Sequence, residues 1–363
     1  MTILHLYKDY YPVLGGIENH VRMLARLQAR RGHQVGVLAC SQDGRTTVEH
    51  REGVRIVKAG RLLTLASMPI SLRQPLLLRR EIPDVVHVHA PYPLGAVANW
   101  LIGPTAAATV ITHHCDIVRQ RRLLKGYAPL LRRVLRSADG IIATNPQYLR
   151  TSLWLRPVRE RCTIVPLGID VPPRPPRRSD GETLLFVGRL RYYKGVDVLL
   201  RALPLFPRGR LVIVGDGPMR LKWQRLALEL GVGARVLFTG EVTDTALAGH
   251  YAAADVFVLP SVNRAEAFGM VLLEAMAAGL PLISTELGTG TSWVNLDGRT
   301  GRVVPSGDPG ALAAAITELL ADRSLREEMG RAARARLESE FDADTMVRRI
   351  DEVYENALRG RAS

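Results

Sequence analysis

Cysteine is scarce in this chain, and its few cysteines form no pattern. The 363 residues contain three of them, Cys40, Cys115 and Cys162, which lie far apart in the sequence. Their spacing matches neither a disulfide framework nor a set of metal ligands. We therefore expect a protein of the reducing cytoplasm that holds no metal through its cysteines.

The sequence also lacks the features that direct a chain into or across a membrane. Residues 1–12 have no basic segment, apolar core or small-residue cleavage site, so they do not resemble a signal peptide. The longest uncharged stretch, residues 90–115, is broken by Asn99, Pro104 and two glycines. A membrane span needs about 20 continuous apolar residues, so this stretch predicts a buried helix followed by a buried strand.

Lysine is rare among the basic residues, whereas arginine is abundant. The chain has 49 basic and 35 acidic residues, a net charge of +14, and only five of the basic residues are lysine. Seven basic residues and no acidic one lie between Arg119 and Arg136. That segment suits an anionic surface on the inner face of a membrane or a phosphorylated acceptor, and the alternative is a solvated helical face.

The same charge raises the possibility of a non-enzymatic protein that binds nucleic acid. The sequence shows no nucleic-acid-binding motif, and few aromatic residues are interleaved with the arginines. We therefore expect no nucleic-acid partner.

Short β-branched apolar runs alternate with helical stretches along the whole chain, a pattern typical of a parallel sheet flanked by helices. A proline-rich, charged segment at residues 171–180 interrupts the alternation and is typical of an interdomain linker. We therefore predict an α/β protein with domains at 1–170 and 181–341, and a C-terminal helix at 342–363 that crosses back to the first domain.

Ligands of doubly wound sheets bind outside the carboxyl ends of the strands, so the loops there are the candidate sites. In the second half, the segment EAFGMVLLEAMAAG predicts a helix that starts near Gly269 and stops at Gly279. Free N–H groups near its start suit a phosphate. Glu266 and Glu274 need partners, either sugar hydroxyl groups or, in the alternative interpretation, a neighbouring arginine.

Two cations, Arg189 and Lys194, follow an earlier strand of the same half. A nucleotide-sugar diphosphate gains negative charge as its bond to the sugar breaks, so cations placed there favour the transition state. Two such cations can take the place of a metal ion. The alternative is that both are ordinary solvated residues near a turn.

In the first half, Gly15 and Gly16 immediately precede a predicted helix, where glycine permits close approach of an anion, although a plain turn is the alternative. His113 and His114 end a predicted strand and point to opposite faces of it, so only one can face a ligand. Asp116 either orients a histidine or binds the acceptor. Asp342-Ala343-Asp344 matches a two-aspartate metal signature, but its acidic residues suit the start of the last helix.

Taken together, these segments resemble glycosyltransferase family 4. The motifs that carry the resemblance follow one another in order across the chain: Gly15 to Glu18, Thr112 to Asp116, Val187 to Arg189 with Lys194-Gly195, Val214 to Pro218, and the two glutamates of EAFGMVLLE. The resemblance implies two facing Rossmann-like domains (GT-B fold) with a cleft between them. It also implies retaining, metal-independent transfer from a nucleotide sugar.

The resemblance further implies roles for particular residues. Arg189 and Lys194 hold the diphosphate with Gly16 near it, Glu274 holds the ribose, and His114 is selected over His113. Glu266 contacts the transferred sugar. The segment that meets the sugar and phosphate is formed by Phe268, Gly269, Met270 and Val271.

Residues 288–308 are similar to those of bacterial transferases that build mannose- or rhamnose-containing surface glycans, such as lipopolysaccharide, from GDP-linked donors such as GDP-mannose. The expected partners are therefore a nucleotide-sugar donor and a glycan or lipid-linked acceptor, with no other cofactor. A sugar-nucleotide epimerase or a phosphorylase with the same fold is the alternative enzyme.

Overall fold

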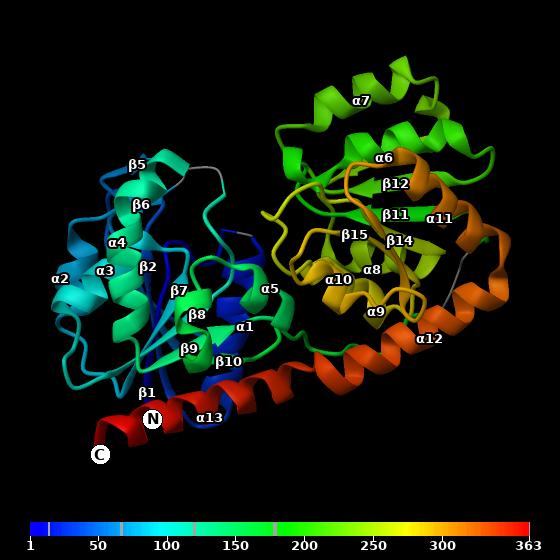
Figure 1. Cartoon of the computed structure of the whole chain (residues 1–363). Helices are drawn as coiled ribbons and strands as arrows, with labels where there is room; N and C mark the ends of the chain where they lie inside the picture. Colours follow the sequence, from blue (N-terminus) through cyan, green and yellow to red (C-terminus); the bar gives the residue numbers. More distant parts are fainter. Residues whose placement is uncertain (14, 66–67, 119–120, 177–179, 363) are drawn as a thin grey trace. The chain divides into compact units, whose positions relative to one another are not determined.

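The computed structural model describes residues 1–13, 15–65, 68–118, 121–176 and 180–362, and it divides the chain into two compact units. The first unit contains residues 1–167 together with 343–363, and the second contains residues 168–342. Each unit is an α/β domain built around its own, largely parallel sheet (Figure 1).

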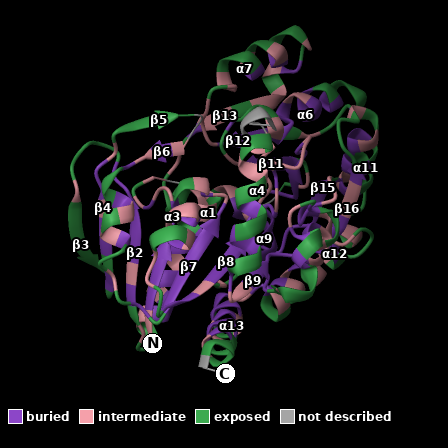
Figure 2. Ribbon diagram, turned by 60° about the vertical axis from the view of Figure 1, so that its left-hand side comes forward, coloured by how far each residue is buried: buried purple, intermediate pink, exposed green. Residues whose placement is uncertain are grey.

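The sheet of the first unit has eight strands in the order β10-β9-β8-β7-β1-β2-β4-β3. All neighbouring strands are parallel except β3 and β4. The central strands are mainly apolar and are buried on both faces, as parallel strands covered by helices must be (Figure 2). The strands are β1 (Thr2–Leu6), β2 (Gln34–Cys40), β3 (Thr47–Arg51), β4 (Val54–Ala59), β7 (Val85–Ala90), β8 (Ala108–His113), β9 (Gly140–Ala143) and β10 (Cys162–Ile164); β5 (Leu63–Leu65) and β6 (Met68–Ile70) form a separate hairpin.

Helices cover both faces of this sheet. α2, α3 and α4 lie side by side on one face, and α1 and α13 lie on the other (Figure 1). Met346, Val347 and Ile350 of α13 pack into a core with residues of β1, β7, β8 and β9, which is why this last helix belongs to the first unit. The helices are α1 (Gly16–Arg30), α2 (Arg73–Leu78), α3 (Pro93–Ile102), α4 (Arg121–Ser137), α5 (Pro146–Thr151) and α13 (Ala343–Ala362).

The sheet of the second unit has six parallel strands in the order β13-β12-β11-β14-β15-β16. β11, β14 and β15 are neighbours at its centre, so the loops that follow them open at the same edge. The strands are β11 (Thr183–Val187), β12 (Arg210–Val214), β13 (Val236–Gly240), β14 (Val256–Leu259), β15 (Leu282–Glu286) and β16 (Gly301–Pro305); the helices are α6 (Val196–Ala202), α7 (Arg220–Glu229), α8 (Asp244–Ala253), α9 (Met270–Ala277), α10 (Thr291–Val294), α11 (Pro309–Ala321) and α12 (Arg323–Glu340).

The boundary between the units lies earlier than the proline-rich segment suggests. The chain joins the second unit at Gly168, because Ile169 N–H donates to Phe341 C=O at 3.0 Å and Arg334 Nη1 donates to Pro172 C=O at 2.9 Å. Part of the predicted linker, residues 177–179, lies outside the described residues. Asp342 ends the second unit, and Asp344 occupies the first turn of α13.

Candidate active site

Lys194 and Glu266 of the second unit form a buried ion pair at the carboxyl edge of its sheet. Lys194 follows β11 and Glu266 follows β14, and Lys194 Nζ lies 2.6 Å from Glu266 Oε2. The hydroxyl group of Ser261 donates to the same Oε2 at 3.0 Å, and all three residues are at least nine-tenths buried. The pair therefore fixes the ammonium group of Lys194 within the loops that follow these two strands.

The environment of Lys194 keeps it charged. Burial by itself lowers the pKa of this ammonium group, but Glu266, together with Tyr193 and Glu274, outweighs that effect, and the pKa lies above its ordinary value. The backbone around it is equally constrained. Gly195 has φ +67°, and a Cβ atom there would lie 2.0 Å from Pro260 C=O, so this position needs glycine.

Arg189 is the second cation of this edge and differs from Lys194 in its surroundings. Its side chain is exposed, and none of the described residues hydrogen-bonds or pairs with it. A guanidinium group without a protein partner keeps all of its N–H donors for an anionic ligand.

The start of α9 contributes N–H groups beside this pair. Gly269 caps the helix with φ +84°, and Leu272 N–H donates to Gly269 C=O at 2.8 Å, so the N–H groups of Met270 and Val271 are the ones without a partner among the described residues. The preceding segment is held in place because Thr289 Oγ1 donates to Glu266 C=O at 2.8 Å. N–H groups placed in this way at a helix start suit an anion.

Glu274 lies one turn into α9, on the same face as Met270. It accepts a hydrogen bond of 2.8 Å from the hydroxyl group of Tyr251 on α8. Burial raises the pKa of Glu274, and the Tyr251 hydrogen bond and the charge of Lys194 oppose that rise. The carboxyl group is half-buried and has acceptor capacity beyond Tyr251 for two adjacent hydroxyl groups of a ligand.

In the first unit, α1 begins at Gly16, directly after Gly15. A Cβ atom built on Gly16 would meet no atom within 4 Å, whereas one on Gly15 would lie 2.2 Å from Glu18 Oε2. The space in front of Gly16 is therefore open, whereas a side chain at Gly15 would need the flexible Glu18 carboxylate to move.

His113 and His114 at the end of β8 have different partners. His113 Nε2 lies 3.0 Å from Asp116 Oδ1, which also accepts from Ser152 Oγ at 2.7 Å. His114 Nε2 lies 3.0 Å from His89 Nδ1, and burial lowers the pKa of His114 well below its ordinary value. Asp116 therefore orients His113, and His114 is held by another histidine.

Comparison with known proteins identifies the family. The model "Glycosyltransferase Family 4" matches residues 14–172, and the model "Glycosyl transferases group 1" matches residues 171–336. O-antigen chain mannosyltransferase C of Escherichia coli is 36% identical over 376 residues, covering 100% of both chains. The D-rhamnosyltransferase WbpZ of Pseudomonas aeruginosa is 38% identical, covering 94% of this chain and 93% of its own. The chain belongs to glycosyltransferase family 4.

The fold agrees with this assignment. The structure of sucrose-phosphate synthase from Thermosynechococcus elongatus superposes with a TM-score of 0.81 at 24% identity, over 99% of this chain and 100% of that one. The prediction of two Rossmann-like domains of the GT-B type is confirmed, and the protein is a glycosyltransferase.

The structure brings together several residues that the family resemblance singled out, with partners that the sequence did not indicate. The interpretation that the two glutamates pair with an arginine is wrong, because Glu266 pairs with Lys194 and Glu274 with Tyr251. The contributions of Ser261 and Thr289 were missed, since serine and threonine in a loop give no distinct signal. A sequence signal does exist for His89, the partner of His114. His87 and His89 lie two residues apart on β7, so their side chains share one face of the sheet.

Proposed function

We propose that this family 4 glycosyltransferase moves a hexose of the mannose or rhamnose type from a nucleotide diphosphate sugar, with GDP as the favoured nucleotide, to a glycan or lipid-linked acceptor. The names of the two relatives, a mannosyltransferase of O-antigen chains and a D-rhamnosyltransferase, support the sugar and the surface-glycan product. The same relatives support a nucleotide-sugar donor and a glycan acceptor as the partners of this protein.

The observation that carries the proposal is the gathering of two cations and a helix start at one sheet edge of the second unit. Lys194, Arg189 and the start of α9 all follow strands that end at this edge, and the Arg189 side chain has no partner in the described part of the chain. The diphosphate of the donor would receive the two cations and the helix N–H groups, Glu274 would accept from the ribose hydroxyl groups, and Glu266 with residues 268–271 would contact the sugar.

The proposed chemistry needs neither a metal ion nor an enzymatic nucleophile. Arg189 and Lys194 would neutralise the charge that develops on the leaving diphosphate. Glu266 is engaged by Lys194 and Ser261, so it is suited to positioning rather than attack. The bond from the sugar carbon to the diphosphate oxygen breaks, the acceptor oxygen bonds to that carbon on the same face, and its proton passes to the diphosphate. The product then retains the anomeric configuration of the donor.

A nucleoside diphosphate should stabilise the protein without a divalent metal. We expect GDP, in the presence of EDTA, to raise the Tm by several degrees, because ligand at a hundredfold its Kd adds about 2.7 kcal/mol to the free energy of unfolding. Thermal unfolding with GDP, UDP and ADP in parallel measures this. The proposal would be refuted by no shift with any of the three at concentrations well above about 1 mM.

We further propose that α4 holds the protein against an anionic membrane. In the described part of the segment from Arg119 to Arg136, Leu131, Val134 and Leu135 face the core, while Lys125, Arg132, Arg133 and Arg136 are exposed; Arg119 lies outside the described residues. Among the described helices, none has the length and apolar character to span a bilayer.

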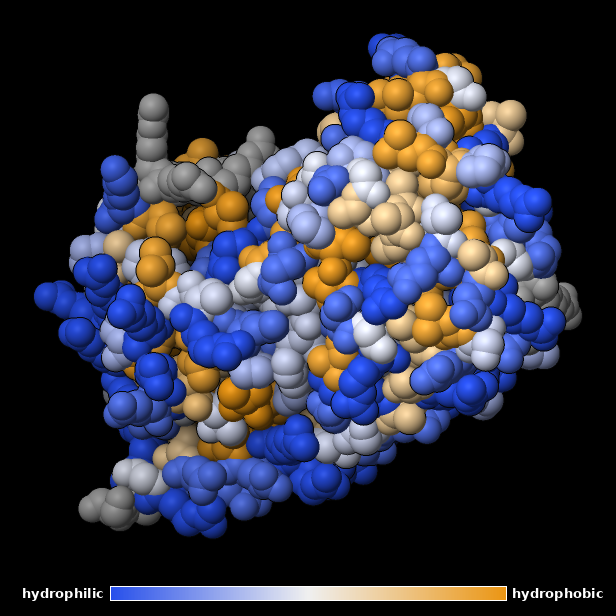
Figure 3. Space-filling view, turned by 45° about the vertical axis from the view of Figure 1, so that its right-hand side comes forward, coloured by the Kyte–Doolittle hydropathy of each residue, from blue (hydrophilic) through white to orange (hydrophobic). Residues whose placement is uncertain are grey.

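Exposed leucines of the same unit support peripheral attachment to a membrane. They lie around the β5–β6 hairpin and α2: Leu62, Leu63, Leu65, Leu72 and Leu76. On the face drawn in Figure 3, hydrophobic side chains form separate groups within a largely hydrophilic surface. Exposed leucines on the unit that carries the basic helix α4 suit shallow contact with lipid.

Neutralising part of α4 should weaken membrane binding selectively. We expect Arg132→Gln with Arg133→Gln to lower the affinity for vesicles that contain phosphatidylglycerol by about thirtyfold, since each basic residue near an anionic surface is worth about 1 kcal/mol. Cosedimentation measures the affinity, with Lys222→Gln and Arg225→Gln on the exposed face of α7 as the charge-matched control. Equal binding by both double variants would refute the role of α4.

A further inference from the structure

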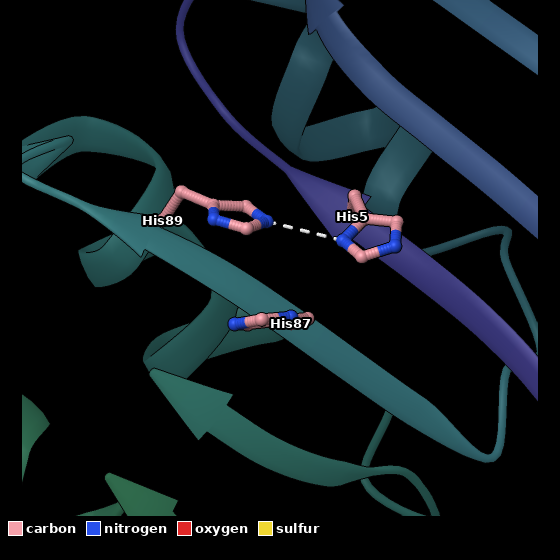
Figure 4. A group of neighbouring side chains, drawn as sticks. All are labelled: His5, His87 and His89. Atoms are coloured by element: carbon pink, nitrogen blue, oxygen red, sulfur yellow. Dashed lines mark hydrogen bonds between the residues drawn. The ribbon is translucent and has the colours of Figure 1, made fainter. Parts of the chain in front are cut away.

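Five of the nine histidines gather in the interior of the first unit. They come from β1, α1, β7 and the end of β8, and all are buried: His5, His20, His87, His89 and His114. Figure 4 shows His5 and His89 facing each other across adjacent strands, with His87 beside them. Burial lowers the pKa of His5 to about 4, and the pKa values of His89 and His114 lie well below the ordinary value for the same reason, so these imidazoles are neutral at physiological pH.

A continuous hydrogen-bond chain links three of these histidines to the C-terminal helix. His114 Nε2 lies 3.0 Å from His89 Nδ1, and His89 Nε2 lies 3.0 Å from His5 Nδ1. His5 Nε2 lies 2.8 Å from Gln28 Oε1 on α1, and Gln28 Nε2 donates to Asp351 Oδ1 on α13 at 3.0 Å. All five residues belong to the first unit.

The carboxylate at the end of the chain determines which nitrogen carries each proton. Burial raises the pKa of Asp351, but the Gln28 hydrogen bond and two neighbouring basic groups favour its ionised form: His33 Nε2 lies 3.5 Å and Arg31 Nη1 3.7 Å from its Oδ2. An ionised carboxylate only accepts, so the amide of Gln28 must turn its NH₂ group to Asp351 and its oxygen to His5. That oxygen also only accepts, so His5 must carry its proton on Nε2.

The same reasoning passes along the neutral imidazoles, each of which has one N–H and one bare nitrogen. His5 Nδ1 is bare and accepts from His89 Nε2–H. His89 Nδ1 is then bare and accepts from His114 Nε2–H. His114 is therefore left with a bare Nδ1, which is buried and to which none of the described residues offers a hydrogen bond.

We propose that Asp351, Gln28, His5 and His89 are positioning residues that hold His114 in its Nε2–H tautomer, so that Nδ1 accepts a hydrogen bond from a hydroxyl group of the transferred sugar. An unsatisfied buried acceptor is unfavourable, and a substrate hydroxyl group removes that penalty. The contact with the sugar rests on the proposed function, whereas the tautomer follows from the chain of bonds alone.

The tautomers can be read from two-bond ¹H–¹⁵N correlation spectra of histidine side chains in the full-length protein. We expect wild-type His5, His89 and His114 to show a protonated Nε2 and a bare Nδ1. Asp351→Asn gives Gln28 a partner that both donates and accepts, so its amide can reverse and the uniform pattern should be lost. Asp351→Glu keeps a carboxylate at this position and should show the wild-type tautomer pattern.

Donor hydrolysis by the same proteins tests the link to the sugar. We expect Asp351→Asn to lower kcat for GDP-mannose hydrolysis by about tenfold, the effect of one weakened hydrogen bond, with a Tm close to that of the wild type. Asp344→Asn is the control. Asp344 also lies on α13 and neighbours Arg31, but it is exposed and does not contact Gln28.

Each outcome decides one part of the proposal. A wild-type His114 with its proton on Nδ1, or an unchanged tautomer pattern in Asp351→Asn, overturns the relay. An altered pattern with unchanged hydrolysis overturns the contact between His114 and the sugar. Absence of donor hydrolysis in the wild type contradicts the proposed function, and the spectra still decide the relay.

Discussion

Arg189→Ala is expected to lower the rate of sugar transfer by about a hundredfold, which corresponds to about 3 kcal/mol of lost charge stabilisation in the transition state. The Tm should stay at the wild-type value, because the Arg189 side chain is exposed and has no partner among the described residues. Turnover of a nucleotide-sugar donor, measured beside thermal unfolding, separates the two effects.

Arg191→Ala is the matched control for this variant. Arg191 is an exposed arginine two residues further along the same loop, and the resemblance to family 4 gives it no role in donor binding. Its removal changes the net charge equally and should change turnover less than about threefold. Near-normal turnover in Arg189→Ala, or an equal loss in both variants, would remove Arg189 from the site.

Lys194→Met should abolish transfer and also destabilise the second unit. Removal of the ammonium group leaves the Glu266 carboxylate buried, with the Ser261 hydroxyl group as its one remaining partner among the described residues. Breaking a buried ion pair from one side typically costs about 3–5 kcal/mol of folding free energy. Denaturant unfolding of the variant measures this loss, and donor turnover measures the activity.

A double variant distinguishes the structural role of the pair from its catalytic one. Glu266→Gln added to Lys194→Met removes the unpaired charge and keeps an acceptor for Ser261, so most of the lost stability should return. Activity should not return, because both the cation proposed to face the diphosphate and the proposed sugar contact of Glu266 are missing. Recovery of activity together with stability would show that Lys194 serves only the fold.

The sequence was sufficient to predict the fold class, for a physical reason. Alternating apolar strands and amphipathic helices leave few arrangements other than parallel sheets covered by helices. A local signal was equally informative at the start of α9. Gly269 was predicted to lie there, and it caps the helix with a positive φ that glycine adopts readily. The boundary at Gly168 was not predictable, because it depends on bonds to Phe341 and Arg334, which are remote in sequence.

The candidate site was predictable as a set of residues but not as a set of contacts. Motif order singled out Lys194, Glu266 and Glu274, yet nothing local states that Lys194 reaches Glu266 or that Tyr251 reaches Glu274. The histidine chain shows the limit most clearly, since His5 and His114 are connected only through the pairing of three strands.

The most direct test of the proposed activity is the slow hydrolysis of nucleotide-sugar donors without an acceptor, in the presence of EDTA. Incubation with GDP-mannose, a UDP-sugar and an ADP-sugar, followed by NMR, reports both the donor consumed and the anomer first released. We predict consumption of GDP-mannose, release of mannose with the anomeric configuration of the donor, and a rate about a hundredfold lower in Arg189→Ala. Consumption of none of the donors, or an equal rate in Arg189→Ala, would contradict the proposal that this edge of the second unit binds the donor.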